Sequence, residues 1–146
     1  MKGANFDLKK VVFLTWEELT SLNTMEISNT RLAQVRDVFC FCCFTGLRYS
    51  DVYNLKKVDI KDDKIEIVTL KDVDNISIEL NKYSRAILEK YQDIEIKKGK
   101  VLPVLTNQKY NEYLKELGQL AEMNEEMTEV WYIGSKRMER TCLLYT

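Results

Sequence analysis

The sequence predicts an α+β fold that is mainly helical, with helices around a small three-stranded antiparallel sheet. Residues 30–45 are apolar at helical spacing. Residues 58–80 then alternate apolar with polar side chains, as half-buried strands do. A helical pattern returns after residue 81, and the total of 146 residues fits one domain or most of one.

Composition places the chain among globular proteins, with 45% hydrophobic and 31% charged residues. The 22 basic and 23 acidic residues leave a net charge of −1, which excludes a polycation, so any contact with nucleic acid depends on local basic groups. No apolar run is long enough to span a membrane, and the first residues lack the apolar core of a signal peptide. We therefore expect a cytoplasmic protein without a membrane partner.

Histidine is absent, which excludes histidine-based catalytic triads and HExxH zinc sites. The five glycines are not spaced as in a phosphate-binding or dinucleotide-binding loop. We expect neither a metal nor a nucleotide cofactor. Cys40, Cys42 and Cys43 lie in one apolar run without zinc-site spacing, and Cys142 lies near the end. We interpret the cysteines as buried free thiols in a reducing compartment.

The N-terminal part predicts two helices and the start of a third. Residues 1–13 are expected to be an extended lead-in or linker remnant. Thr15 and Glu18 form a capping box, and Leu14 and Leu19 a hydrophobic staple, for a helix to about Asn23. A second helix is expected over Thr30–Thr45, stopped by Gly46.

A short third helix is expected with Ser50 as its N-cap and with Val52 and Leu55 facing inward. Arg48 then lies between two helix ends, where a cation beside free amide groups favours a phosphate.

The strands of the expected meander are Val58–Ile60, Ile65–Thr69 and Asn75–Leu80, with Lys71 at the mouth of the second hairpin. Asn81 is expected to cap the next helix. Thr106 or Asn107 caps a long helix after it, and Thr128–Ile133 is a strand that turns at Gly134 and Ser135. The expected inward residues of the two helices are Tyr83, Ile87, Tyr91, Tyr110, Leu114, Leu117, Leu120 and Ala121.

Arg48 and Lys71 carry little information when each is taken alone. An arginine after a helix-ending glycine is usually a surface residue, and a hairpin lysine is usually solvated. Taken together, in this order and in this helix–sheet pattern, the two residues are more informative. Residues 45–55, TGLRYSDVYNL, resemble the first arginine motif of the tyrosine recombinases (phage-integrase family), and residues 14–19, LTWEEL, are similar to the opening of that family's catalytic domain. Residues 104–115 resemble integrases of mobile elements, and the likeness spans about Phe13 to Arg140.

The resemblance implies DNA strand exchange through a phosphotyrosyl intermediate, without metal or nucleotide. It makes Arg48 one of two arginines that clamp the phosphodiester, and Lys71 the general acid that protonates the departing 5′-oxygen. The implied partners are double-stranded DNA and other recombinase protomers in a synaptic complex.

The sequence also departs from the family's pattern. It has no histidine-x-x-arginine motif followed by a nucleophilic tyrosine, and neither Arg137 nor Arg140 begins one. Tyr145 is expected to be a surface residue and Trp131 a packing residue. We therefore expect residues 14–146 to be a partial catalytic domain, inactive alone.

Two other interpretations remain open. The chain is alternatively a non-catalytic helical interaction or regulatory module. Its mild acidity and the Tyr/Leu-rich helix over residues 107–123 are compatible with protein partners. The third is an α+β domain that merely contains the sequence TGLR.

Overall fold

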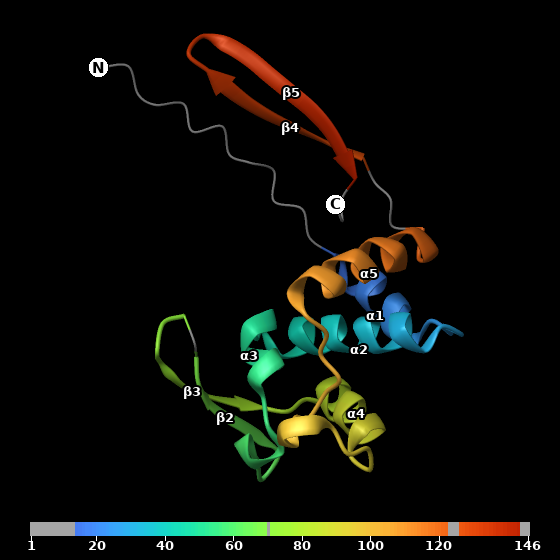
Figure 1. Ribbon diagram of the computed structural model, residues 1–146, viewed down its shortest axis with the longest axis vertical. Coiled ribbons are helices and arrows are strands. Elements are labelled where there is room, and N and C mark those ends of the chain that lie inside the picture. Colours follow the sequence, from blue (N-terminus) through green and yellow to red (C-terminus); the bar gives the residue numbers. More distant parts are fainter. Residues whose placement is uncertain (1–13, 70, 123–125, 144–146) are drawn as a thin grey trace.

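The computed structural model describes residues 14–69, 71–122 and 126–143, the segments 126–131 and 139–143 by their backbone only (Figure 1). Within these residues the chain is mainly helical with a three-stranded antiparallel sheet, which confirms the expected fold class. The helices are α1 (Trp16–Thr24), α2 (Thr30–Thr45), α3 (Tyr49–Asn54), α4 (Lys82–Tyr91) and α5 (Asn107–Leu120). The strands are β1 (Ile60–Lys61), β2 (Lys64–Val68), β3 (Asn75–Glu79), β4 (Glu126–Ile133) and β5 (Lys136–Leu143), and two short 3₁₀ turns lie at Lys57–Asp59 and Lys97–Gly99.

The starts of α1 and α2 follow from local sequence. Thr15 Oγ1 accepts from the backbone N–H of Glu18, and the Glu18 carboxylate accepts from the N–H of Thr15, so the predicted capping box is confirmed. Asn29 caps α2 by accepting from two backbone N–H groups of its first turn. Gly46 ends α2 with φ of 73°, a left-handed conformation that glycine adopts at no steric cost.

Helix α2 is the centre of the fold. It contacts α1, α3, α4 and α5, and Figure 1 shows it crossing the middle of the helical body. Val35, Val38 and Phe41 are at most 2% exposed, so the apolar segment of the sequence forms the core. Buried residues of the sheet and the later helices join the same core, including Ile65, Ile87, Tyr91, Tyr110 and Leu117.

Two charged side chains of α2 are also buried. Arg36 Nε donates to Asp37 Oδ1 at 2.8 Å, and Arg36 Nη1 donates to the carbonyl oxygens of Leu22 and Met25. Lys90 Nζ reaches the same Oδ1 atom at 3.2 Å. The buried charges are thus paired and hydrogen-bonded, and they tie the end of α1 and helix α4 to α2.

The three-stranded sheet has the order β1-β2-β3, with Ile65 opposite Ile78 and Ile67 opposite Ile76. These isoleucines lie on its inner face, as the alternation predicts. The first strand is shorter than expected, because Val58 and Asp59 belong to a 3₁₀ turn. Asp59 Oδ2 accepts from the Lys56 backbone N–H at 2.8 Å, and such a local bond competes with strand pairing.

The N-caps of α4 and α5 lie at predicted positions, and one residue predicted to face the core does not. Asn81 caps α4 as predicted, and Ile87 and Tyr91 are buried. Thr106 is the N-cap of α5 but its side chain makes no capping hydrogen bond, and Leu120 is 51% exposed. The prediction that Leu120 faces the core is therefore wrong, because it lies in the last turn of α5, beyond the buried Leu117.

Strands β4 and β5 form a second, two-stranded sheet with Ile133 opposite Lys136. The predicted turn at Gly134 and Ser135 is confirmed, whereas the partner strand was not expected. Figure 1 shows this hairpin apart from the helices. Among the described residues, no helix is both long and apolar enough to cross a bilayer.

Candidate functional site: Arg48 and the β2–β3 hairpin

Each residue of the segment Thr45–Arg48 has a local role. Thr45 Oγ1 donates to the Phe41 carbonyl oxygen at 2.7 Å and accepts from the Leu47 N–H at 3.4 Å. Gly46 supplies the left-handed turn, and Leu47 is buried in the core. Arg48 follows in an extended conformation as the N-cap residue of α3, with its side chain about half exposed. The turn therefore places a guanidinium group at the surface, directly after a residue that is buried in the core.

Helix α3 begins two residues earlier than predicted. Its N-cap is Arg48, so the prediction that Ser50 caps it is wrong. Leu47 follows Gly46 directly and is buried in the core. This burial fixes the direction of the chain, and the helix begins two residues later at Tyr49. Val52 and Leu55 are each 1% exposed, as predicted, and anchor the helix to the core.

Aromatic contacts hold α3 against α5. The ring of Tyr49 stacks on Tyr110 with centroids 4.9 Å apart, and the Tyr49 hydroxyl donates to the carbonyl oxygen of Leu105. Burial raises the pKa of both tyrosines above the usual value. Tyr110 is buried and the Tyr49 hydroxyl is bonded to a carbonyl oxygen, so both side chains position the segment that carries Arg48.

The structure brings Arg48 to the hairpin that carries Lys71. Arg48 Nη1 lies 3.0 Å from Oδ2 of Asp72, the residue directly after Lys71, and these two side chains are 49% and 51% exposed. Lys71 itself is exposed. The two cationic residues therefore belong to one surface region.

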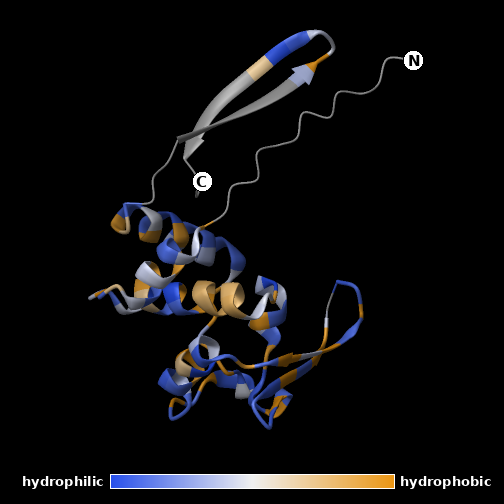
Figure 2. Cartoon of the chain, turned by 180° about the vertical axis from the view of Figure 1, so that it is seen from behind, coloured by the Kyte–Doolittle hydropathy of each residue, from blue (hydrophilic) through white to orange (hydrophobic). Residues whose placement is uncertain are grey.

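The connection between β2 and β3 is held at its base. The Thr69 N–H donates to the Asp74 carbonyl oxygen at 2.9 Å, and Thr69 Oγ1 accepts from the Asp74 N–H at 3.2 Å. Val73 has φ of 55°, which is unfavourable for a β-branched residue. Figure 2 shows this connection as a largely hydrophilic loop at the edge of the molecule. Thr69 and Asp74 thus hold together the base of the loop that carries Lys71 and Asp72.

Sequence reasoning missed Asp72. The signal that could have found it is an acidic residue directly after the hairpin lysine, in a loop that returns toward the arginine motif. Its partner lies 24 residues away in sequence, so only the tertiary structure shows the pairing.

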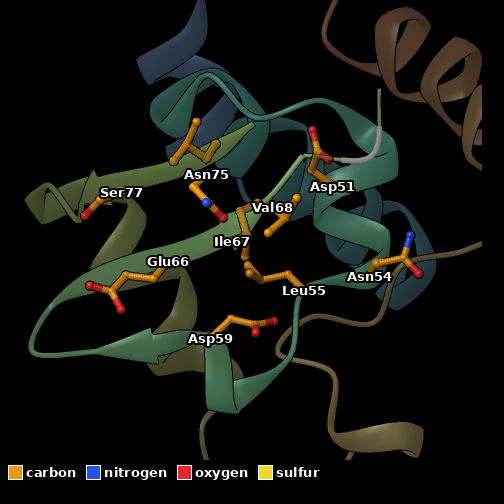
Figure 3. A pocket seen from close by; sticks show the side chains of 10 residues that line it. Asp51, Asn54, Leu55, Asp59, Glu66, Ile67, Val68, Asn75 and Ser77 are labelled. Atoms are coloured by element: carbon orange, nitrogen blue, oxygen red, sulfur yellow. The ribbon is translucent and has the colours of Figure 1, made fainter. Parts of the chain in front are cut away.

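A cavity of about 590 Å³ lies between α3 and the sheet (Figure 3). Its polar lining includes the carboxylates of Asp51, Asp59 and Glu66, and no lysine or arginine of the described segments lines it. In Figure 3, Asp51 and Asn54 lie on α3, and Glu66, Val68 and Ser77 on the strands. A cavity lined by three carboxylates repels phosphate, so the anion-binding candidate is the surface around Arg48 and not this cavity.

The cysteines of α2 differ from one another. All three are free; Cys40 is buried, Cys42 is partly buried and Cys43 is exposed. The prediction of buried thiols is confirmed for Cys40 and wrong for Cys43, because successive residues of a helix point in different directions. Burial raises the pKa of Cys40 and of Cys42 to about 12. The described residues contain no group of three metal-ligating side chains.

Of the remaining residues considered from the sequence, the structure describes the side chain of Arg137. Arg137 is on β5 and is exposed. The side chains of Trp131, Arg140 and Cys142, the whole of Tyr145 and residues 1–13 lie outside the described residues.

Comparison with known proteins finds a likeness in structure and none in sequence. No family model matches the chain, and no curated protein matches it. The crystal structure of XerA recombinase matches with a TM-score of 0.60 and 17% sequence identity, over 79% of this chain and 45% of that one. The chain thus spans less than half the length of that recombinase. The site around Arg48 thus lies in a fold that this chain shares with XerA recombinase.

Proposed function

We propose that this chain forms part of the catalytic domain of a tyrosine recombinase that acts on double-stranded DNA. The observation that carries the proposal is the ion pair that brings Arg48 of the TGLR segment to the hairpin of Lys71. The fold shared with XerA recombinase, a tyrosine recombinase, supports it.

In the proposed reaction Arg48 binds the non-bridging oxygens of the scissile phosphodiester. A guanidinium group donates two parallel hydrogen bonds to such oxygens and keeps its charge at any working pH. The negative charge that builds on these oxygens in the transition state is then stabilised more than in the ground state, which lowers the barrier.

Lys71 has the second role, as the acid for the leaving group. When a tyrosine oxygen attacks phosphorus, the bond from phosphorus to the 5′-oxygen breaks and that oxygen needs a proton. An exposed ammonium group on a loop is able to reach the oxygen and donate one. The free 5′-hydroxyl and the phosphotyrosyl bond are the products, so no metal or nucleotide is consumed.

The proposal makes this chain one contributor to a larger site. Its 146 residues include no histidine and no match to the second arginine motif. Because the members of a catalytic site act together, Arg48 and Lys71 are expected to be inactive alone. Incubation with a nicked suicide DNA substrate should give no covalent protein–DNA adduct, and an adduct would contradict this part of the proposal. Other recombinase protomers are the proposed protein partners.

DNA binding tests the proposal through Arg48. Fluorescence anisotropy with a labelled duplex, measured over a range of salt concentrations, gives the affinity and its salt dependence. Arg48→Ala should weaken binding and lower the slope of log K against log salt by about 0.9, the value for one lost phosphate contact.

Arg85 is a matched control, since it is a half-exposed arginine that pairs with an aspartate at 3.4 Å. That aspartate is Asp63, in the turn between β1 and β2. Arg85→Ala should keep the affinity and slope of the unaltered protein. Absence of DNA binding would contradict the proposed function, and equal slopes for the Arg48 variant and the unaltered protein would remove Arg48 from the site.

A further inference from the structure

The Arg48 guanidinium already holds an anion supplied by the chain itself. Asp72 Oδ2 receives its hydrogen bond from Nη1 at 3.0 Å, and the two side chains meet across two separate segments, the start of α3 and the β2–β3 loop. Carboxylates and phosphates compete for the same donor fork of an arginine. The Asp72 carboxylate therefore stands where a phosphodiester bound to Arg48 would place an oxygen.

The ion pair between Arg48 and Asp72 is weak enough for another anion to replace Asp72. It uses one nitrogen of the guanidinium, and both partners are about half exposed, so water screens the attraction. A buried pair such as Arg36 with Asp37, by contrast, is at most 8% exposed and keeps further hydrogen bonds. Exchange of Asp72 for another anion leaves no buried charge without a partner.

We propose that Asp72 is a displaceable counter-ion that occupies Arg48 until a DNA phosphodiester replaces it. The inference rests on the proposed function and adds a regulatory contact to the same site. In the free protein the ion pair holds the β2–β3 loop against the start of α3. Binding of DNA breaks the pair and frees the loop segment next to Lys71 at the step where Lys71 is needed.

The DNA affinity of Asp72→Asn tests the competition. Since an exposed ion pair contributes little, removal of the carboxylate should tighten binding by about two- to five-fold. The matched control is Asp63→Asn, which removes one charge from the other turn of the sheet, where Asp63 pairs with Arg85. Asp63→Asn should change the affinity by less than the Asp72 variant does.

A double-mutant cycle separates the ion pair from the general loss of negative charge. In an Arg48→Ala background, Asp72→Asn should no longer tighten binding beyond the effect of Asp63→Asn. If Asp72→Asn tightens binding equally with and without Arg48, the inference is overturned. If Asp72→Asn equals the unaltered protein while Arg48→Ala weakens binding, the inference fails and the proposed function stands. If no variant binds DNA, both fail.

Arginine modification gives a readout without DNA. Phenylglyoxal reacts with accessible guanidinium groups, and peptide mass spectrometry follows Arg48 and Arg85 separately. Asp72→Asn should speed modification of Arg48 about two- to five-fold and leave the rate at Arg85 unchanged. Asp63→Asn should instead speed modification of Arg85 and leave the rate at Arg48 unchanged. An unchanged rate at Arg48 in the Asp72 variant would show that the pair does not hold Arg48 in solution, and would overturn the inference.

Discussion

The hydroxyl group of Tyr91 donates a hydrogen bond of 2.6 Å to Asp37 Oδ2, and this bond joins α4 to α2 inside the core. Arg36 and Lys90 both contact the other oxygen, Oδ1. Among the described residues, Tyr91 is therefore the donor to Oδ2. Burial, and then this bond to the carboxylate, raise the pKa of Tyr91 above its usual value.

Tyr91→Phe should lower the free energy of unfolding by about 2 kcal/mol, because it leaves one oxygen of a buried carboxylate without that donor. Urea denaturation should show a lower midpoint with an unchanged slope. Tyr83→Phe is the control, since the Tyr83 hydroxyl makes no hydrogen bond within the part of the chain that the structure describes. Equal losses in the two variants would show that the bond to Asp37 adds no stability.

Gly46→Ala should destabilise the protein by about 1 kcal/mol, because a Cβ disfavours the left-handed conformation at φ of 73°. Apart from Gly46 and its two chain neighbours, no heavy atom of the described residues lies within 4 Å of the position of the added Cβ, so the cost is conformational and not steric. Gly46→Asn should lose less, since asparagine tolerates this region. Thermal unfolding compares the two variants, and equal stability of Ala and Asn would contradict the conformational account.

Stability should fall as pH rises above 9. The pKa of Cys40 and of Cys42 is about 12 in the folded state against 9.0 for an unperturbed thiol, mainly because burial disfavours the thiolate. Below pH 9 both states keep these protons. Between pH 9 and 10 the unfolded state loses them and the folded state does not, which costs about 1 kcal/mol for each thiol.

Urea unfolding at pH 8, 9 and 10 measures this effect. The pKa of Cys43 is also raised by burial, so its contribution has the same sign. Cys42→Ala should reduce the loss between pH 9 and 10 by about 1 kcal/mol relative to the unaltered protein. A pH dependence identical in the two proteins would show that Cys42 ionises equally in the folded and unfolded states.

Lys71→Ala should lower the salt slope of DNA binding by about 0.9, if the ammonium group contacts one phosphate. Lys71→Arg should keep the slope, because it keeps the charge. Lys115 is an exposed lysine of α5 and serves as the control, with no expected change on replacement by alanine. Anisotropy titrations at several salt concentrations measure all three, and an unchanged slope for Lys71→Ala would place Lys71 outside the DNA contact.

Local signals in the sequence predicted helices better than strand ends. Helix α2 spans the predicted Thr30–Thr45, because the apolar segment and Gly46 both act on neighbouring residues. Ser50 was wrong as a cap, and Val58 and Asp59 were wrong as a strand. In both places several local conformations are compatible with the sequence, and contacts with the core and with Lys56 select among them.

The sequence by itself determined the α+β class, the capping box at Thr15, the core helix and the order in which Arg48 and Lys71 occur. These depend on periodicity and on side chains that act within a few residues. Only the tertiary structure decided that Arg48 meets Asp72, that Cys43 is exposed and that the cavity beside α3 is acidic. Such relations depend on how distant segments pack, and hydrophobic burial sets that packing through the whole core at once.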